Sequence, residues 1–168
     1  MKRIVSVALL VVICLSLQGC GSIKKAEEQV DRLLSFIDSG NIEKLSLKIF
    51  YKDPYVLTPY PWQVDNLLSN NSSVQKIEVG GQELSEHIES LRLLEQKILK
   101  KPKEEVALDA SIYYYFEADG EKLLEVALWG IGAEITEDME LAVFIGDVAV
   151  VDPDSIFLRI IEPFLPEE

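Results

Sequence analysis

Cysteine and histidine are scarce in this chain. Its 168 residues include two cysteines, Cys14 and Cys20, and one histidine, His87. One histidine excludes a metal site built from several imidazole ligands. The sequence also contains neither a phosphate-binding loop nor the nucleophile elbow of a serine hydrolase. The chain therefore offers few of the side chains that most often mark a reaction.

A long apolar run is missing as well. The most apolar stretch, Ile4 to Leu17, covers 14 residues, whereas a membrane-spanning helix needs about 20. Lys2 and Arg3 precede this stretch and the small residue Gly19 follows it, which is the pattern of a cleavable signal peptide. An ordinary secretory signal or an uncleaved anchor that happens to hold a cysteine would show the same features.

The sequence Leu17-Gln18-Gly19-Cys20 resembles the lipobox of bacterial lipoproteins. The resemblance implies removal of residues 1–19 and a diacylglyceryl thioether on Cys20. It places the protein on the extracytoplasmic face of a bacterial membrane, which is the plasma membrane in a Gram-positive cell. Two acyl chains suffice for stable anchoring. Cys14 would leave with the signal peptide, so the mature chain would have no intrachain disulfide, thiolate metal site or cysteine nucleophile.

Positive charge is in short supply. The formal net charge is −13, and loss of Lys2 and Arg3 would leave 14 basic residues against 29 acidic ones. Phosphate backbones repel such a chain, so we expect no nucleic-acid partner. Residues 20–25 would form a short lipidated tether, and residues 26–168 are enough for one domain with a hydrophobic core.

The first half of the domain shows mainly helical patterns. Apolar spacing predicts an amphipathic helix over residues 24–39, and Asn41 is placed to cap a second, shorter helix with Ile42, Leu45 and Ile49 inward. Pro61 is suited to begin a short helix with Val64, Leu67 and Leu68. A short strand is expected over Val74–Val79, and a long helix with apolar residues from Leu84 to Ile98 runs until Pro102.

The second half of the domain is predicted to form two hairpins and a helix. Asp119-Gly120 is a strong turn signal between Val106–Glu117 and Lys122–Trp129, and a two-residue turn would place Phe116 opposite Leu123. Met139–Ile145 and Val148–Val151 form a second hairpin across Gly146-Asp147. A last helix follows Asp152-Pro153, with Ile156, Phe157, Ile160 and Ile161 inward. This order predicts an α+β fold with helices packed on a mainly antiparallel sheet of four to five strands.

A second resemblance concerns the mature part. Ile77-Glu78-Val79 with the Leu84–Leu99 helix, the run from Ser111 to Glu117, Leu128-Trp129-Gly130 and Pro163-Phe164-Leu165-Pro166 look like small uncharacterised lipoproteins of Firmicutes. That group implies no active site. The order of elements is also loosely similar to cystatin or NTF2-type folds, although the terminal helix departs from the latter.

Chemically informative positions are few. His87 lies at the edge of the long helical stripe and is more typical of a polar boundary residue than of a catalytic triad. Gly130-Ile131-Gly132 lacks the third glycine of a dinucleotide site. Glu134, Glu137, Asp138 and Glu140 lack the spacing of a calcium loop, and Asp152 and Asp154 suit helix capping. The sequence predicts no catalytic residue, no metal and no cofactor.

Aromatic residues gather in one proline-rich segment, which holds Phe50, Tyr51, Tyr55, Tyr60 and Trp62. Amphipathic rings on a stiff loop make good contact surfaces, so Tyr51, Tyr55, Tyr60 and Trp62 form a candidate surface for a protein or glycan of the cell envelope. The alternative is that these rings cover the sheet as core and lid.

Together these features favour a membrane-anchored extracytoplasmic lipoprotein with a non-enzymatic binding domain. Two alternatives stay open. One is a carboxylate-dependent hydrolase acting on envelope glycans, because acidic residues are numerous enough to supply a pair. The other is a purely structural envelope protein.

Overall fold

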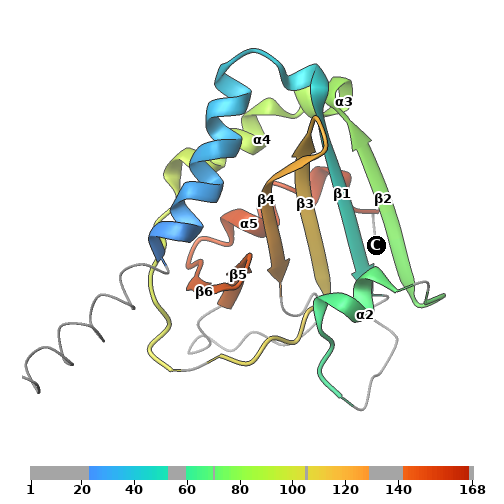
Figure 1. Cartoon of the computed structure of the whole chain (residues 1–168), viewed down its shortest axis with the longest axis vertical. Helices are drawn as coiled ribbons and strands as arrows, with labels where there is room; N and C mark the ends of the chain where they lie inside the picture. The colour runs from blue at the N-terminus through green and yellow to red at the C-terminus, as the bar shows by residue number, and fades with distance from the viewer. Residues whose placement is uncertain (1–22, 53–59, 70, 105, 129–141, 167–168) are drawn as a thin grey trace, which may run out of the picture.

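Six antiparallel strands form a single sheet in the order β2-β1-β3-β4-β5-β6 (Figure 1). This computed structural model describes residues 23–52, 60–69, 71–104, 106–128 and 142–166. The strands are β1 (Leu45–Lys52), β2 (Val74–Gly80), β3 (Ile112–Ala118), β4 (Glu121–Leu128), β5 (Ala142–Ile145) and β6 (Val148–Val151). The predicted α+β class is confirmed, with one or two strands more than expected.

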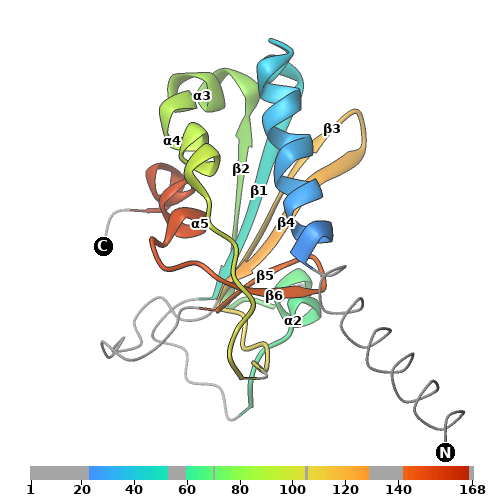
Figure 2. The same cartoon turned by 90° about the vertical axis from the view of Figure 1, so that its left-hand side faces the viewer.

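Most helices pack on one face of this sheet (Figure 2). The N-terminal helix covers residues 23–38, close to the expected 24–39. The other elements are η1 (Ile42–Lys44), α2 (Val64–Leu68), α3 (Gly81–Glu86), α4 (Ile88–Arg92), η2 (Leu93–Gln96), α5 (Ile156–Arg159) and η3 (Glu162–Phe164). Of the helices that the structure describes, only the short α2 lies on the opposite face (Figures 1 and 2). We call the two sides the helical face and the α2 face.

The prediction of a second helix after Asn41 is wrong. Only one 3₁₀ turn, η1, follows Asn41, and the chain then continues as β1. Leu45, Leu47, Ile49 and Tyr51 are buried in strict alternation with half-buried neighbours. This period of two places every second side chain on the helical face, as in a strand. The helical prediction relied on the spacing of Leu45 and Ile49 and did not take account of the apolar Leu47 between them.

The β3–β4 hairpin forms where it was predicted, but its register differs by one residue. Asp119 and Gly120 adopt φ of 51° and 80° in the turn. A β-bulge between Phe116 and Glu117 then places Phe116 opposite Leu124 rather than Leu123. Because side chains alternate along a strand, this slip moves Leu124, Val126 and Leu128 to the face of Phe116. The predicted pairing of Phe116 with Leu123 would have placed these three side chains on the other face.

The predicted long helix is broken at His87. It starts earlier, at Gly81, and is divided into α3, α4 and η2, which ends at Gln96. His87 has φ −111° and ψ 26°, outside the helical range, and its ring lies edge-on to Phe164 with centroids 5.1 Å apart. Leu84, Leu91 and Leu94 are buried as expected, whereas Ile98 lies beyond the helix and is 56% exposed.

The C-terminal elements agree with the sequence. Strands β5 and β6 pair across Gly146-Asp147, and Ile156, Phe157, Ile160 and Ile161 are all buried. The N-cap residue of α5 is Ser155, whose side chain makes no capping hydrogen bond. The carboxylate of Asp152, three residues earlier, accepts the backbone N–H of Phe157 in the first turn at 2.9 Å.

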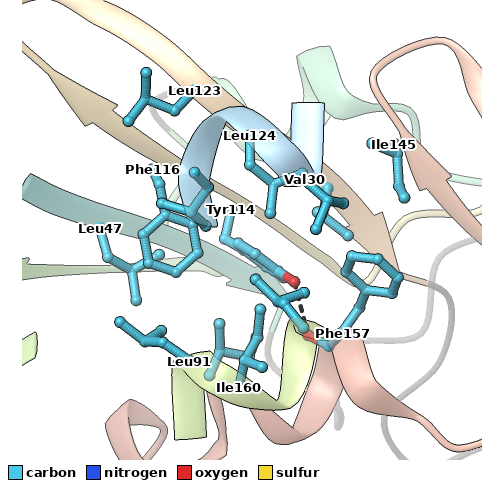
Figure 3. Close-up of a cluster of buried hydrophobic side chains, with 14 of the residues drawn as sticks. Val30, Leu47, Leu91, Tyr114, Phe116, Leu123, Leu124, Ile145, Phe157 and Ile160 are labelled. Carbon is cyan, nitrogen blue, oxygen red and sulfur yellow. Dashed lines mark hydrogen bonds between the residues drawn. The ribbon is translucent and has the colours of Figure 1, made fainter. Parts of the chain in front are cut away.

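The main core lies between the helical face and the helices (Figure 3). Tyr114 and Phe116 of β3 stand in its centre, with Val30 from the N-terminal helix and Phe157 from α5 around them. Tyr114 is fully buried, and its hydroxyl donates to the carbonyl oxygen of Phe157 at 2.7 Å. The sheet is therefore tied to α5 by a hydrogen bond as well as by apolar contact.

Candidate functional site

The predicted aromatic surface is divided by the structure. Tyr51 points into the main core, where it is 8% exposed, and its hydroxyl donates to Oε1 of Gln75 on β2. Trp62 instead packs in a second apolar cluster on the α2 face. Tyr51 thus belongs to the core, which is the alternative that the sequence left open for these rings.

The remaining positions of that surface differ in accessibility. Tyr60 is 78% exposed, and Trp62 is half-buried with the Lys52 ammonium 5.6 Å from its ring centroid. The backbone N–H of Trp62 donates to Asp109 at 2.9 Å, which fixes the segment that enters α2. Tyr55 and Cys20 lie outside the described residues, as does the acidic cluster Glu134–Glu140.

A different group of side chains gathers on the α2 face of the central strands. We call it the aromatic–lysine cluster; it consists of Lys48, Phe50, Tyr113, Tyr115, Lys122 and Glu125. The register places Phe50 opposite Tyr113 and Lys48 opposite Tyr115, and Tyr115 opposite Glu125. Helix α2 packs at one end of this face, and in the described part of the chain no other helix covers it (Figure 2).

The rings of the cluster form one contiguous apolar strip. Phe50 and Tyr115 are stacked with centroids 6.2 Å apart and an interplanar angle of 22°, and Tyr113 lies 5.9 Å from Tyr115. The ammonium of Lys122 sits 4.6 Å from the Tyr115 centroid, and that of Lys48 sits 5.6 Å from it. These distances are within the range of cation–π attraction.

Lys122, Tyr113 and Glu125 are joined by hydrogen bonds. Lys122 Nζ donates to Tyr113 Oη and to Glu125 Oε2, both at 2.9 Å, and Tyr113 Oη donates to the same carboxylate oxygen at 2.8 Å. Lys48 forms a separate ion pair with Glu117. Each ammonium therefore lies between a ring and a carboxylate.

Burial and these hydrogen bonds shift the protonation equilibria of the network. Burial raises the pKa of Tyr113 to about 12. Burial alone would lower the pKa of Lys122, but the hydrogen bonds to Tyr113 and Glu125 raise it above its ordinary value. Burial would likewise raise the pKa of Glu125, but the hydrogen bonds from Lys122 and Tyr113 lower it.

These shifts limit the chemistry of the cluster. General acid–base catalysis works best with a group whose pKa lies near the operating pH. All three shifts move the groups away from neutrality, so Tyr113 and Lys122 stay protonated and Glu125 stays ionised. The cluster is suited to contact a partner through rings, ammonium groups and carboxylates, and poorly suited to transfer protons.

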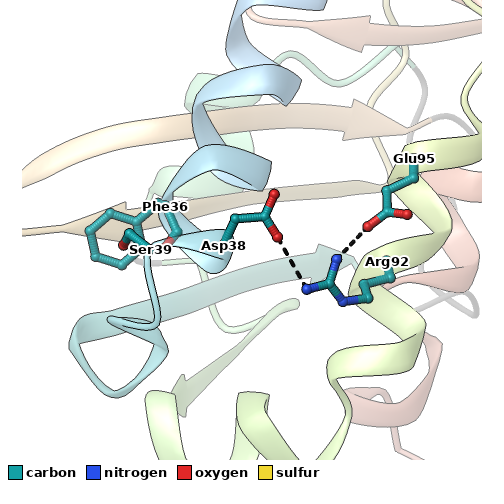
Figure 4. A network of polar contacts seen from close by, with 5 residues as sticks. All are labelled: Phe36, Asp38, Ser39, Arg92 and Glu95. Atoms are coloured by element: carbon teal, nitrogen blue, oxygen red, sulfur yellow. Dashed lines mark hydrogen bonds and ion pairs between the residues drawn. The ribbon is translucent and has the colours of Figure 1, made fainter.

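Two grooves lie elsewhere on the surface. The larger, of about 940 Å³, runs between the N-terminal helix and the β3–β4 turn region and is lined by Phe36 and Leu123 among others. Its charged groups are engaged, as in the Arg32–Glu121 pair at 3.6 Å. Outside this groove, Arg92 of α4 bridges Asp38 of the N-terminal helix and Glu95 of η2 (Figure 4). The smaller groove, of about 470 Å³, is lined by residues 101–104 and Val106 on one side and by residues 147–149 on the other.

Two further properties, metal binding and membrane spanning, concern only the described ranges. No group of three or more histidine, cysteine, aspartate or glutamate side chains there is arranged to hold a metal ion. None of the helices in the same ranges is long and apolar enough to cross a bilayer.

The residues of the aromatic–lysine cluster were assigned to different predicted elements of the sequence. Tyr113 and Tyr115 lie within the predicted strand Val106–Glu117, and their alternate spacing puts them on one face of it. Lys48 instead fell within the predicted second helix, and Phe50 within the proline-rich segment. Only the correct assignment of β1 brings these four residues together. Comparisons with known proteins add nothing to this geometry: no protein family, curated protein or solved structure matches the chain.

Proposed function

We propose that this chain is a lipid-anchored lipoprotein of the bacterial cell envelope whose domain binds a protein partner without catalysis. The observation that carries the binding role is the aromatic–lysine cluster. Its Phe50 and Tyr115 rings are half-buried with lysine ammonium groups beside them, whereas its Tyr113 ring is buried next to α2. Tyrosine and other aromatic side chains supply much of the binding energy at protein interfaces. The anchor is carried by the sequence Leu17-Gln18-Gly19-Cys20.

A protein partner fits the cluster better than a glycan does. Sugar rings would need access to the flat faces of the aromatic side chains. Lys122 and Lys48 already stand over Tyr115, and Lys76 stands 5.7 Å from the Phe50 centroid. A protein surface can meet the same ammonium groups with its own carboxylates.

The carboxylate-dependent hydrolase finds less support in this geometry. Burial raises the pKa of Asp152, as a general acid requires. Its side chain is, however, 3% exposed and bonded to the N–H of Phe157. In the larger groove, Glu121 is paired with Arg32, and Asp31 is paired with Lys97 at 2.8 Å.

The binding role is tested by photo-crosslinking in intact cells. A photoreactive phenylalanine analogue would replace Tyr115 in one variant and Tyr60, which is exposed but outside the cluster, in a matched control. We expect a discrete protein adduct from position 115 that is absent from position 60 and is lost when Lys122→Glu is added. An adduct with glycan would favour the alternative partner, and equal labelling from both positions would contradict a role for the cluster.

The anchor is tested separately. Cys20→Ala should abolish incorporation of an alkyne fatty acid and release the protein from the membrane fraction, because the lipobox then lacks the thiol that the lipid modifies. Ser22→Ala, two residues away, serves as the control and should label normally. Continued labelling of the Cys20→Ala variant would rule out this lipidation site.

A further inference from the structure

Strand β2 forms one edge of the sheet. Among the described residues it pairs with β1 on one side and with no strand on the other. The opposite edge is partly closed, because Val151 of β6 donates its N–H to the carbonyl oxygen of Lys100 at 2.9 Å. An edge strand presents peptide groups that can pair with another chain.

The register shows which peptide groups of β2 point outward. Lys52 donates its N–H to Ser111, on the β3 side of β1, at 2.8 Å. Because peptide groups alternate in direction along an antiparallel strand, Ile49 and its odd-numbered neighbours face β2. Ile77 lies opposite Ile49 and therefore directs its peptide groups at β1. Those of Lys76 and Glu78 consequently face the free edge.

The side chains of these two residues are charged, exposed and of opposite sign. Lys76 and Glu78 are 54% and 56% exposed and lie 3.7 Å apart on the α2 face. A two-fold axis through Ile77 would place Lys76 opposite Glu78 of a second copy, and Glu78 opposite its Lys76. Moving the axis to Lys76 or to Glu78 would instead set like charges directly opposite each other, which is destabilising.

We propose that β2 is a self-pairing edge, through which two copies of this chain join as antiparallel strands centred on Ile77. The two sheets then become continuous, and both copies keep their helices on the same side. Helix α3 follows β2 directly and packs against η1, β1 and the end of β2, on the helical face rather than beside the strand. Because the contact is confined to one seven-residue strand, the dimer is reversible and dependent on concentration. The pairing is independent of the proposed lipid anchor.

Charge exchange at the edge tests the proposal. The full-length chain would be studied in detergent by sedimentation equilibrium, with circular dichroism to verify folding. Lys76→Glu and Glu78→Lys each create two like-charge pairs, and each should raise the dimer dissociation constant about tenfold. The double variant Lys76→Glu/Glu78→Lys restores both opposite-charge pairs and should recover the wild-type constant. A monomeric wild-type protein, unaffected single variants or an unrecovered double variant would each overturn the proposal.

Disulfide trapping tests the register. In a full-length chain with Cys14→Ser and Cys20→Ser, Ile77→Cys would place one thiol on each side of the axis. Ile77 then meets its own copy in a non-hydrogen-bonded pair, with Cα atoms about 4.5 Å apart, which permits a disulfide. Gln75→Cys is the control, because its thiols would be about 13 Å apart. Oxidation should link the first variant only, and equal linkage of both, or of neither, would contradict this register.

Discussion

At the scale of single residues, burial decides what a polar group can do. Asp152 is a buried carboxyl group whose Oδ2 accepts the N–H of Phe157. Burial raises its pKa, although the backbone N–H groups of Phe157 and Ile156 partly oppose that effect. Its role follows from this setting: it holds the start of α5 against the sheet and is shielded from any substrate.

The raised pKa of Asp152 predicts a pH dependence of stability. A carboxyl group with a higher pKa in the folded state than in the unfolded state favours folding while it is protonated. That contribution is present below the ordinary value of 3.8 and is lost as the pH rises through the folded-state pKa. Asp152→Asn keeps an oxygen acceptor without the charge, so its free energy of unfolding relative to wild type should increase between pH 3.5 and pH 7.

Urea denaturation at several pH values measures this difference. Asp152→Ala, which loses the acceptor, should be less stable than Asp152→Asn by about 1 kcal/mol at each pH. A difference between Asn and wild type that falls from pH 3.5 to pH 7 would show that the folded-state pKa is lowered instead.

At the scale of elements, α3 is positioned by a close approach of two backbones. A Cβ atom on Gly81 would lie 2.3 Å from the carbonyl oxygen of Ile42 and 2.6 Å from the Cα of Glu43, both in η1. Gly80, the last residue of β2, has nothing within 4 Å of the corresponding point. The two adjacent glycines therefore differ in their steric surroundings. Only at Gly81 does the lack of a side chain allow α3 to contact η1.

We therefore expect Gly81→Ala to lower the free energy of unfolding by about 1–3 kcal/mol, the usual cost of overpacking. Gly80→Ala is the matched control and should change it by less than about 0.5 kcal/mol. Chemical denaturation of both variants provides the measurement. Equal effects of the two substitutions would show that η1 moves aside to accommodate the methyl group.

The elements were predictable where local signals agreed. Asp119-Gly120 located the β3–β4 turn, and Gly146-Asp147 located the next one. The bulge after Phe116 had no local signal, so the register and the faces of β4 were wrong. For β1, Leu45 and Ile49 fit a helical spacing as well as an extended one, and pairing with β2 and β3 decided between them.

The candidate site was less accessible to prediction than the fold. Sequence proximity grouped Tyr51 with Trp62, but Tyr51 packs in the main core on the helical face and Trp62 packs in the smaller cluster on the α2 face. The aromatic–lysine cluster depends instead on cross-strand neighbours such as Phe50 and Tyr113, which are 63 positions apart in the chain. Such neighbours follow from the register alone.

At the scale of the whole molecule, one sheet supports two apolar clusters. The main core lies on the helical face, and a smaller cluster around Leu67, Ala110, Tyr113 and Ala127 lies under α2. Both clusters use side chains of β3 and β4, so the smaller one cannot form before these strands are paired. The main core in turn needs the same strands.

This arrangement predicts a single cooperative unfolding transition. In a Trp129→Phe variant, the fluorescence of Trp62 reports the smaller cluster, while far-UV circular dichroism reports the helices and the sheet. We expect the two urea transitions to superimpose. A fluorescence midpoint clearly below that of circular dichroism would mean that α2 and Trp62 detach while the main core stays folded.

The attachment of the N-terminal helix has a mechanical consequence. Lys25 pairs with Asp147 in the β5–β6 turn at 2.8 Å, and the buried Gln29 accepts the N–H of Glu125 at 3.2 Å. Tension applied to the chain ahead of residue 23 would therefore reach the sheet at its β4–β5 side. The exposed salt bridge of Lys25 would break first. The hydrogen bond of Gln29, whose side chain lies against Gly146, would break next, and only then would the helix separate from the core.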